Sequence, residues 1–294
     1  MTEIALDRSD YFSARKREVQ ALHWHIAQMR RWGGGSRPAP IHHLIAFDAG
    51  LYSRHEPVLS GHPYQSNAAN LYDQARSAAA HLPGFYADYL PGIGTSEASR
   101  QVASVAGLQS ASHRNMAELA YQRLVERMVS QRGRGSPISH APWGISVSLV
   151  ALGRGQISAF ALAERLSKDG LVGSDGRQFA PPGVPVRGMV LLAPLLTAMD
   201  GAIAMPANVE GPVLVVRPRD GPLAPFVAFD YATESRVYIA ELGLQHVGLV
   251  GGSDLHGMGA AVLEGATAYL QRCGVPLSDV PAHRQFIPGQ VGLV

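Results

Sequence analysis

The sequence has one cysteine, Cys273, among 294 residues, which excludes an intramolecular disulfide. No apolar run approaches the roughly 20 residues of a membrane span, and the longest, at residues 188–196, has the length of a buried strand. The first residues also lack the basic segment and apolar core of a signal peptide. These absences predict a soluble, cytoplasmic protein without a transmembrane segment, whose export would need a signal-independent route.

A concentration of charge of one sign is missing as well. The 25 Lys and Arg residues nearly balance 23 Asp and Glu residues, and the longest basic block is residues 15–17. A nucleic-acid partner is therefore not expected. What the chain does have is 46% hydrophobic residues, which is ample for a sizeable core in one large α/β domain.

Residues 146–166 organise the rest of the chain. They combine an apolar strand, a tight glycine turn and an amphipathic helix over 155–168. Further strands are predicted at 41–47, 189–192, 213–216, 237–242 and 247–250, further helices at 9–32, 115–130 and 258–272, and loops over most of 51–100. Strands that alternate with helices indicate an α/β fold with a doubly wound, mostly parallel sheet flanked by helices.

The turn in this stretch has the shape of a nucleophile elbow without its nucleophile. In such an elbow a strand enters Gly-x-Ser-x-Gly and continues into a helix. The turn here is Ala151-Leu152-Gly153-Arg154-Gly155. Glycine offers no oxygen that could form an acyl-enzyme. The sequence therefore predicts a hydrolase-like fold more firmly than it predicts a reaction.

Several short motifs carry a resemblance, in order along the chain: Phe47-Asp48-Ala49-Gly50, Ser66-Asn67-Ala68 with Leu71-Tyr72, residues 89–95, Arg154-Gly155 and residues 252–257. Together they resemble a bacterial family of α/β-hydrolase-fold proteins that includes the phospholipase-type effectors of type VI secretion systems. The resemblance covers about residues 41–276. It implies an α/β-hydrolase-like domain over 41–276. The helical pattern before Gly33 predicts an N-terminal helix and linker over 1–40, and the lack of periodicity beyond Pro276 predicts a tail over 277–294.

The register of this resemblance places Gly153 at the nucleophilic serine, Pro194 at the acid and Gly252 at the histidine. The resemblance thus implies a pseudo-lipase with a binding or accessory role. Its partner would be a protein, such as an effector or a secretion component, or a lipid-like ligand. No cofactor is expected. The residues implied for the oxyanion hole and pocket are Asp48, Ala49, Gly50 and Arg154.

The sequence leaves other chemistries open. An active serine esterase or phospholipase with a relocated site would use Ser253, Asp254 and His256, although triad members normally come from separate loops. Asp48, Asp254 and His256 would instead suit a calcium ion if their loops meet. Ser158 is expected to bond a backbone carbonyl. A relocated site requires a serine within about 3.5 Å of a histidine.

Overall fold

The structure is a computed structural model that describes residues 41–50, 66–103, 112–132, 144–194, 204–211, 213–218, 237–242 and 258–278. The predicted helix at 9–32, the strand at 247–250, the segment 1–40 and nearly all of the tail lie outside this part of the chain. So do four of the predicted site residues, Gly252, Ser253, Asp254 and His256.

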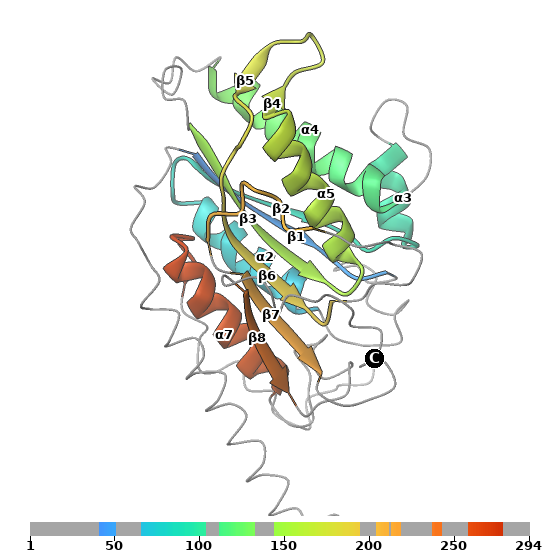
Figure 1. Ribbon diagram of the computed structural model, residues 1–294, viewed down its shortest axis with the longest axis vertical. Coiled ribbons are helices and arrows are strands. Elements are labelled where there is room, and N and C mark those ends of the chain that lie inside the picture. Colours follow the sequence, from blue (N-terminus) through green and yellow to red (C-terminus); the bar gives the residue numbers. More distant parts are fainter. Residues whose placement is uncertain are drawn as a thin grey trace, which may run out of the picture.

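The centre of the fold is a six-stranded sheet in the order β2-β1-β3-β6-β7-β8, with every pair parallel (Figure 1). Its strands are β1 (Ile41–Phe47), β2 (Phe85–Leu90), β3 (Ile145–Leu152), β6 (Val186–Leu192), β7 (Val213–Pro218) and β8 (Val237–Leu242). The order reverses direction on either side of β1, as a doubly wound sheet requires. The predicted fold class is confirmed.

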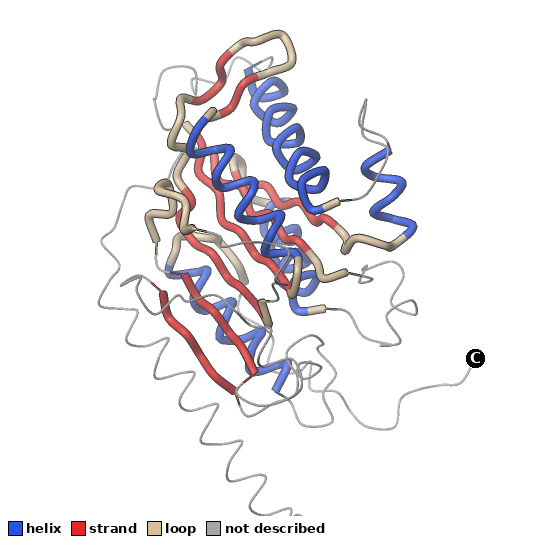
Figure 2. The backbone as a smooth tube through the Cα atoms, turned by 45° about the vertical axis from the view of Figure 1, so that its right-hand side comes forward, coloured by secondary structure: helices blue, strands red, loops and turns tan. Residues whose placement is uncertain are grey.

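Helices cover both faces of the sheet (Figure 2). One face packs against α3 (Ser96–Ala103), α4 (His113–Arg132) and α5 (Gly155–Lys168), and the other against α2 (Asn67–Ala79) and α7 (Met258–Arg272). Side chains of β1 alternate between the two cores, because Ile45 and Phe47 join the first and Leu44 and Ala46 the second. Burial on both faces explains why the strands are almost entirely apolar.

The predicted elements match the structure at 41–47, 155–168, 237–242 and 258–272, and the other described strands differ only at their ends. The expectation of loops over 51–100 is wrong, because α2, β2 and α3 lie there. Pro83 stands between α2 and β2, and Pro91 between β2 and α3. Polar residues cap the two helices: Ser66 Oγ accepts from the Ala69 N–H at 3.1 Å, and Thr95 Oγ1 from the Ala98 N–H at 3.0 Å.

A short antiparallel hairpin follows α5 and was absent from the sequence prediction. It consists of β4 (Leu171–Val172) and β5 (Gln178–Ala180), which are too short to show a period in the sequence. Within the described residues, no helix combines the length and apolar character needed to cross a membrane.

Candidate functional site

The strand, turn and helix around Gly153 form a built elbow at the carboxyl edge of the sheet. Gly153 follows β3 with a φ of 54°, and its N–H donates to the Leu192 carbonyl at 2.8 Å. Gly155 opens α5 so close to β1 that a Cβ there would lie 2.8 Å from the carbonyl oxygens of Phe47 and Asp48. Glycine is required at Gly155 by this contact and favoured at Gly153 by its left-handed backbone.

The neighbouring strand ends in a second left-handed residue. Ala193, directly after β6, has a φ of 43°, and its N–H donates to the Val216 carbonyl at 2.7 Å. A residue with a Cβ in this conformation costs about 1–3 kcal/mol, and such strain persists only where surrounding contacts enforce it. The buried Pro194 follows and brings no carboxylate to this edge. The carboxyl ends of β3 and β6 are therefore both shaped by constrained backbone.

Asp48 is a buried hub at the end of β1. Its Oδ1 accepts from the Ala49 N–H at 2.9 Å, and its Oδ2 accepts from the hydroxyls of Ser66 and Tyr89 at 2.6 Å each. Burial raises the pKa of Asp48 to about 6, with a smaller upward contribution from Glu97, against the three hydrogen bonds that lower it. The carboxylate joins β1 to β2 and to the start of α2.

The sequence assigned Asp48, Ala49 and Gly50 to an oxyanion hole and pocket, and Asp48 also to a cation site. The Ala49 N–H is directed at Asp48, so the loop after β1 is held by its own carboxylate. Among the described residues, no three metal-ligating side chains of the His, Cys, Asp or Glu type come together. Asp254 and His256 lie outside them, and a cation site that includes Asp48 remains a prediction.

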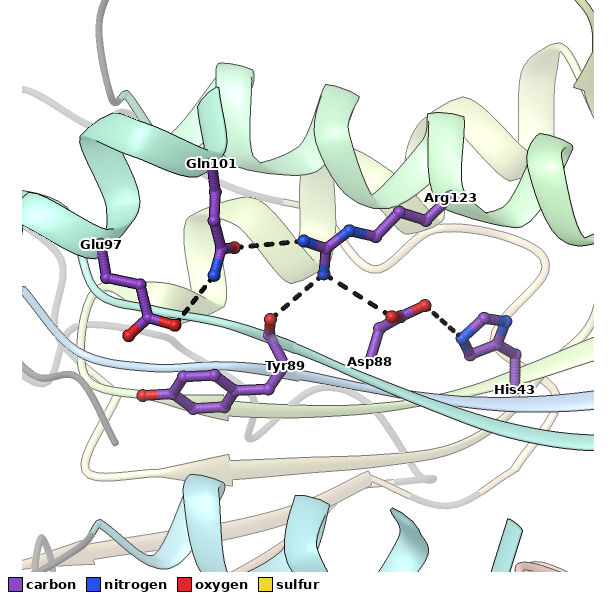
Figure 3. A network of polar contacts seen from close by, with 6 residues as sticks. All are labelled: His43, Asp88, Tyr89, Glu97, Gln101 and Arg123. Atoms are coloured by element: carbon purple, nitrogen blue, oxygen red, sulfur yellow. Dashed lines mark hydrogen bonds and ion pairs between the residues drawn. The ribbon is translucent and has the colours of Figure 1, made fainter. Parts of the chain in front are cut away.

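A polar network connects β1, β2, α3 and α4 beside this hub (Figure 3). His43 Nε2 lies 2.7 Å from Asp88 Oδ2, and Arg123 Nη1 lies 3.6 Å from Asp88 Oδ1. Arg123 also donates to the Tyr89 carbonyl and to Gln101 Oε1, both at 3.2 Å, and Gln101 Nε2 donates to Glu97 at 2.9 Å. The network ties α3 and α4 to the strand that carries Tyr89.

Neighbouring charges set the pKa of Asp88 in this network. Burial raises the pKa of Asp88, but the hydrogen bond and charge of His43 and the charges of Arg123 and Arg127 outweigh it, so the net shift is downward. The sequence prediction missed the network. His43, Asp88 and Arg123 are separated from one another by tens of residues, and only the pairing of β1 with β2 brings His43 and Asp88 together.

Ser158 meets the distance condition for a relocated nucleophile, with its Oγ 3.3 Å from His113 Nδ1. The hydrogen bond that the structure gives Ser158 is thus to a histidine side chain, where the sequence predicted a backbone carbonyl. Arg154 Nε donates to His113 Nε2 at 3.4 Å, and because a guanidinium only donates, Nε2 must accept. A neutral His113 then carries its proton on Nδ1 and donates to Ser158. This arrangement does not withdraw a proton from Ser158, which is also 1% exposed.

A second pair of contacts joins serine to histidine at the opposite end of the strands. His42 Nδ1 lies 2.8 Å from Ser146 Oγ, and its Nε2 lies 3.1 Å from Ser148 Oγ. Burial lowers the pKa of His42 to about 3, with smaller contributions from Arg187 and His43. These residues stand near the amino ends of β1 and β3, away from the edge where ligands bind in open α/β sheets. They form a neutral internal cluster.

Comparisons with known proteins give similarity in structure only. No protein-family model matches the chain, and no curated protein matches it. An uncharacterized protein from Pseudomonas aeruginosa is similar over 93% of this chain and 51% of its own, with 13% identity and a TM-score of 0.51.

Two further structures have lower TM-scores. A putative hydrolase of the α/β superfamily from Xanthomonas campestris pv. campestris is similar over 81% of this chain and 99% of its own, with 14% identity and a TM-score of 0.36. The Tle1 effector, in a structure bound to the VgrG spike of the type VI secretion system, is similar over 74% of this chain and 52% of its own, with 13% identity and a TM-score of 0.42.

These findings concern the fold. The chain spans about half the length of the Pseudomonas protein, and at 13% identity the similarity carries no residue roles. The parallel, doubly wound sheet and the elbow at Gly153 make the fold α/β-hydrolase-like.

Proposed function

We propose that this chain is a catalytically silent protein with an α/β-hydrolase-like fold, retained for binding. One observation carries the proposal: the elbow is fully built, with a left-handed Gly153 and a tightly packed Gly155, yet no hydroxyl stands at its apex. Covalent ester hydrolysis needs a nucleophile at that place, with a base and an acid behind it. Gly252 and Pro194, at the other two positions in the register, offer neither.

The binding role follows from how much of the site is maintained. Asp48 is held buried by three hydrogen bonds although its ionised form is costly there, and Ala193 stays in a strained conformation. A chain that had lost all use of this edge would gain stability by relaxing such features. The resemblance of its motifs to type VI secretion phospholipase-type effectors supports a related accessory role. The partner would be a lipid-like ligand, or a protein such as an effector or secretion component.

Purified protein tests the proposal directly. We expect no turnover of p-nitrophenyl butyrate or of phospholipid vesicles above the rate in buffer, because no activated nucleophile is present. Turnover that Ser253→Ala or His256→Ala abolishes would contradict it. Ser130→Ala is the matched control, since Ser130 is exposed and only bonds the Glu126 carbonyl of its own helix.

An active serine esterase with a relocated site is the second candidate. Its favouring observation is the 3.3 Å separation of Ser158 and His113, and it requires His113 to give up the hydrogen bond from Arg154 so that Nδ1 can accept from Ser158. A fluorophosphonate probe followed by peptide mass spectrometry separates the two candidates, because it modifies only activated serines. If the protein is catalytically silent, we expect no labelled serine. Stoichiometric labelling of Ser158 or Ser253 would instead establish the active esterase.

A further inference from the structure

Gln156 presents an unusual side chain in the first turn of α5. It is 0% exposed, and within the part of the chain that the structure describes neither Nε2 nor Oε1 has a hydrogen-bond partner. In either orientation the amide brings one donor group and one acceptor atom to this buried position. Buried polar groups of this kind are few in native proteins, and each one lowers stability.

The position of Gln156 is as informative as its burial. It stands three residues after Gly153, and its N–H lies 3.5 Å from the Gly153 carbonyl. Side chains in the first turn of a helix generally lean toward its N-terminus, which in α5 is the elbow. Arg154, the N-cap residue, makes no side-chain cap hydrogen bond. The helix therefore starts without a side-chain cap, close to Gly153, which has no side chain.

We propose that Gln156 is the recognition residue of a binding site for a primary carboxamide or another group with the same hydrogen-bonding edge. The inference rests on the proposed function, because the ligand would take the place next to Gly153 where an active elbow carries its nucleophile. The amide N–H of Gln156 donates to the carbonyl of the ligand, and the ligand N–H donates to Oε1. This double hydrogen bond satisfies both orphan atoms at once.

Other ligand groups fit the two atoms less well. A carboxylate only accepts, so it pairs with Nε2 and leaves Oε1 facing negative charge. An amine only donates and pairs with Oε1 alone. A trans peptide bond has its N–H and its carbonyl on opposite edges and cannot contact both atoms of one amide. The primary amide is therefore the group that the pair of unsatisfied atoms selects.

The first experiment needs no ligand. Gln156→Met keeps the size of the side chain and removes both orphan atoms, so we expect the melting temperature of the ligand-free protein to rise by about 2–4 °C. Gln122→Met is the matched control. Gln122 is a half-buried helix residue whose amide already donates to Glu118 at 3.1 Å, and its replacement should bring no rise. A lower melting temperature for Gln156→Met would show that the amide is satisfied, which overturns the proposal.

The second experiment uses hexanamide, hexanoate and hexylamine at matched millimolar concentrations, equilibrated with the protein before heating because the amide has no exposed surface. We expect hexanamide to raise the melting temperature of the wild type and of Gln122→Met, and to bind Gln156→Met about tenfold or more weakly. In ¹⁵N-labelled protein, the side-chain amide signal that is absent from Gln156→Met should shift on addition of hexanamide.

Equal effects of hexanamide on the wild type and Gln156→Met, or no effect on either, would overturn the proposal. Tighter Gln156-dependent binding of hexanoate would also overturn it, in favour of an anion site at the start of α5. These results are distinct from those of the proposed function. Ester hydrolysis by the wild type would refute the silent elbow, while the dependence of hexanamide binding on Gln156 is read from melting temperatures and amide signals alone.

Discussion

The hydroxyl of Tyr89 donates to Oδ2 of Asp48 at 2.6 Å, across the pair of strands that starts the doubly wound sheet. Both groups are buried, so this bond is formed away from water and counts for more than a surface contact would. Asp48 also accepts a hydrogen bond from the hydroxyl of Ser66 at the start of α2. The bond from Tyr89 therefore links the candidate site to the stability of the fold.

The pKa of Asp48 predicts how stability depends on pH. Burial raises it from 3.8 in the unfolded chain to about 6 in the folded protein, so the folded state binds the proton more tightly. The resulting stabilisation is present in full below pH 3.8 and is lost as the pH rises through 6. Over this window Asp48 should lower the free energy of unfolding by about 3 kcal/mol.

Urea denaturation of the wild type and Asp48→Asn at several pH values between these limits measures this contribution. As the pH rises from 3.8 through 6, the wild type should lose about 3 kcal/mol of unfolding free energy relative to Asp48→Asn. Asp175→Asn, at an exposed position, should show no such change. A difference that stays constant with pH would mean that Asp48 does not titrate in this range.

Tyr89→Phe removes one of the two hydroxyls that contact Oδ2. We expect it to destabilise the protein by about 1–3 kcal/mol at neutral pH, since it leaves a buried carboxylate with one donor fewer. Because the Tyr89 hydrogen bond lowers the pKa of Asp48, its loss should raise that pKa further. A double-mutant cycle with Asp48→Asn isolates the pair, and a coupling near zero would show that the bond contributes nothing.

Arg123 holds α3 and α4 to β2 through Asp88, the Tyr89 carbonyl and Gln101. Arg123→Met keeps most of the apolar stem and removes these contacts, so we expect a loss of about 1–3 kcal/mol. Arg127→Met is the control on the same helix, where the guanidinium lies 5.3 Å from the centre of the Tyr86 ring, and should cost less than about 1 kcal/mol. Hydrogen exchange in α3 should quicken only in the Arg123 variant.

The fold was predictable from the sequence where buried elements leave a regular pattern of apolar residues. Strands β1 and β3 are continuous apolar runs, and the glycines after β3 mark the elbow, so both could be placed in advance. The segment with α2 and β2 was misjudged, because polar and small residues dominate it and its order depends on caps such as Ser66.

The site was predicted less fully than the fold. Asp48 was singled out because it follows a strand, but its contacts with Ser66 and Tyr89 depend on strand pairing that no local pattern records. Gln156 was overlooked because a glutamine in a helix is ordinarily an exposed, favourable residue. Only three-dimensional packing shows that its amide is buried without a partner.

Gly155→Ala tests the close approach of α5 to β1. The new Cβ would lie 2.8 Å from two backbone carbonyl oxygens, which cannot move as a flexible side chain would, so the helix start must shift. We expect a loss of about 2–4 kcal/mol in the free energy of unfolding. Gly50→Ala is the control, because its Cβ would lie 3.8 Å from the nearest atom. Equal stability of the two variants would refute this packing.

Gly153→Ser tests whether the elbow accepts the residue that an active hydrolase has there. The φ of 54° at Gly153 lies in the left-handed region, so any residue with a Cβ should cost about 1–2 kcal/mol, whether it is serine or alanine. Equal destabilisation of Gly153→Ser and Gly153→Ala would show that the cost comes from the backbone alone. Greater stability of the serine variant would mean that its hydroxyl finds a partner. In that case, labelling of the introduced serine by a fluorophosphonate would show that a base lies within reach of the elbow and that only the nucleophile is missing from this chain.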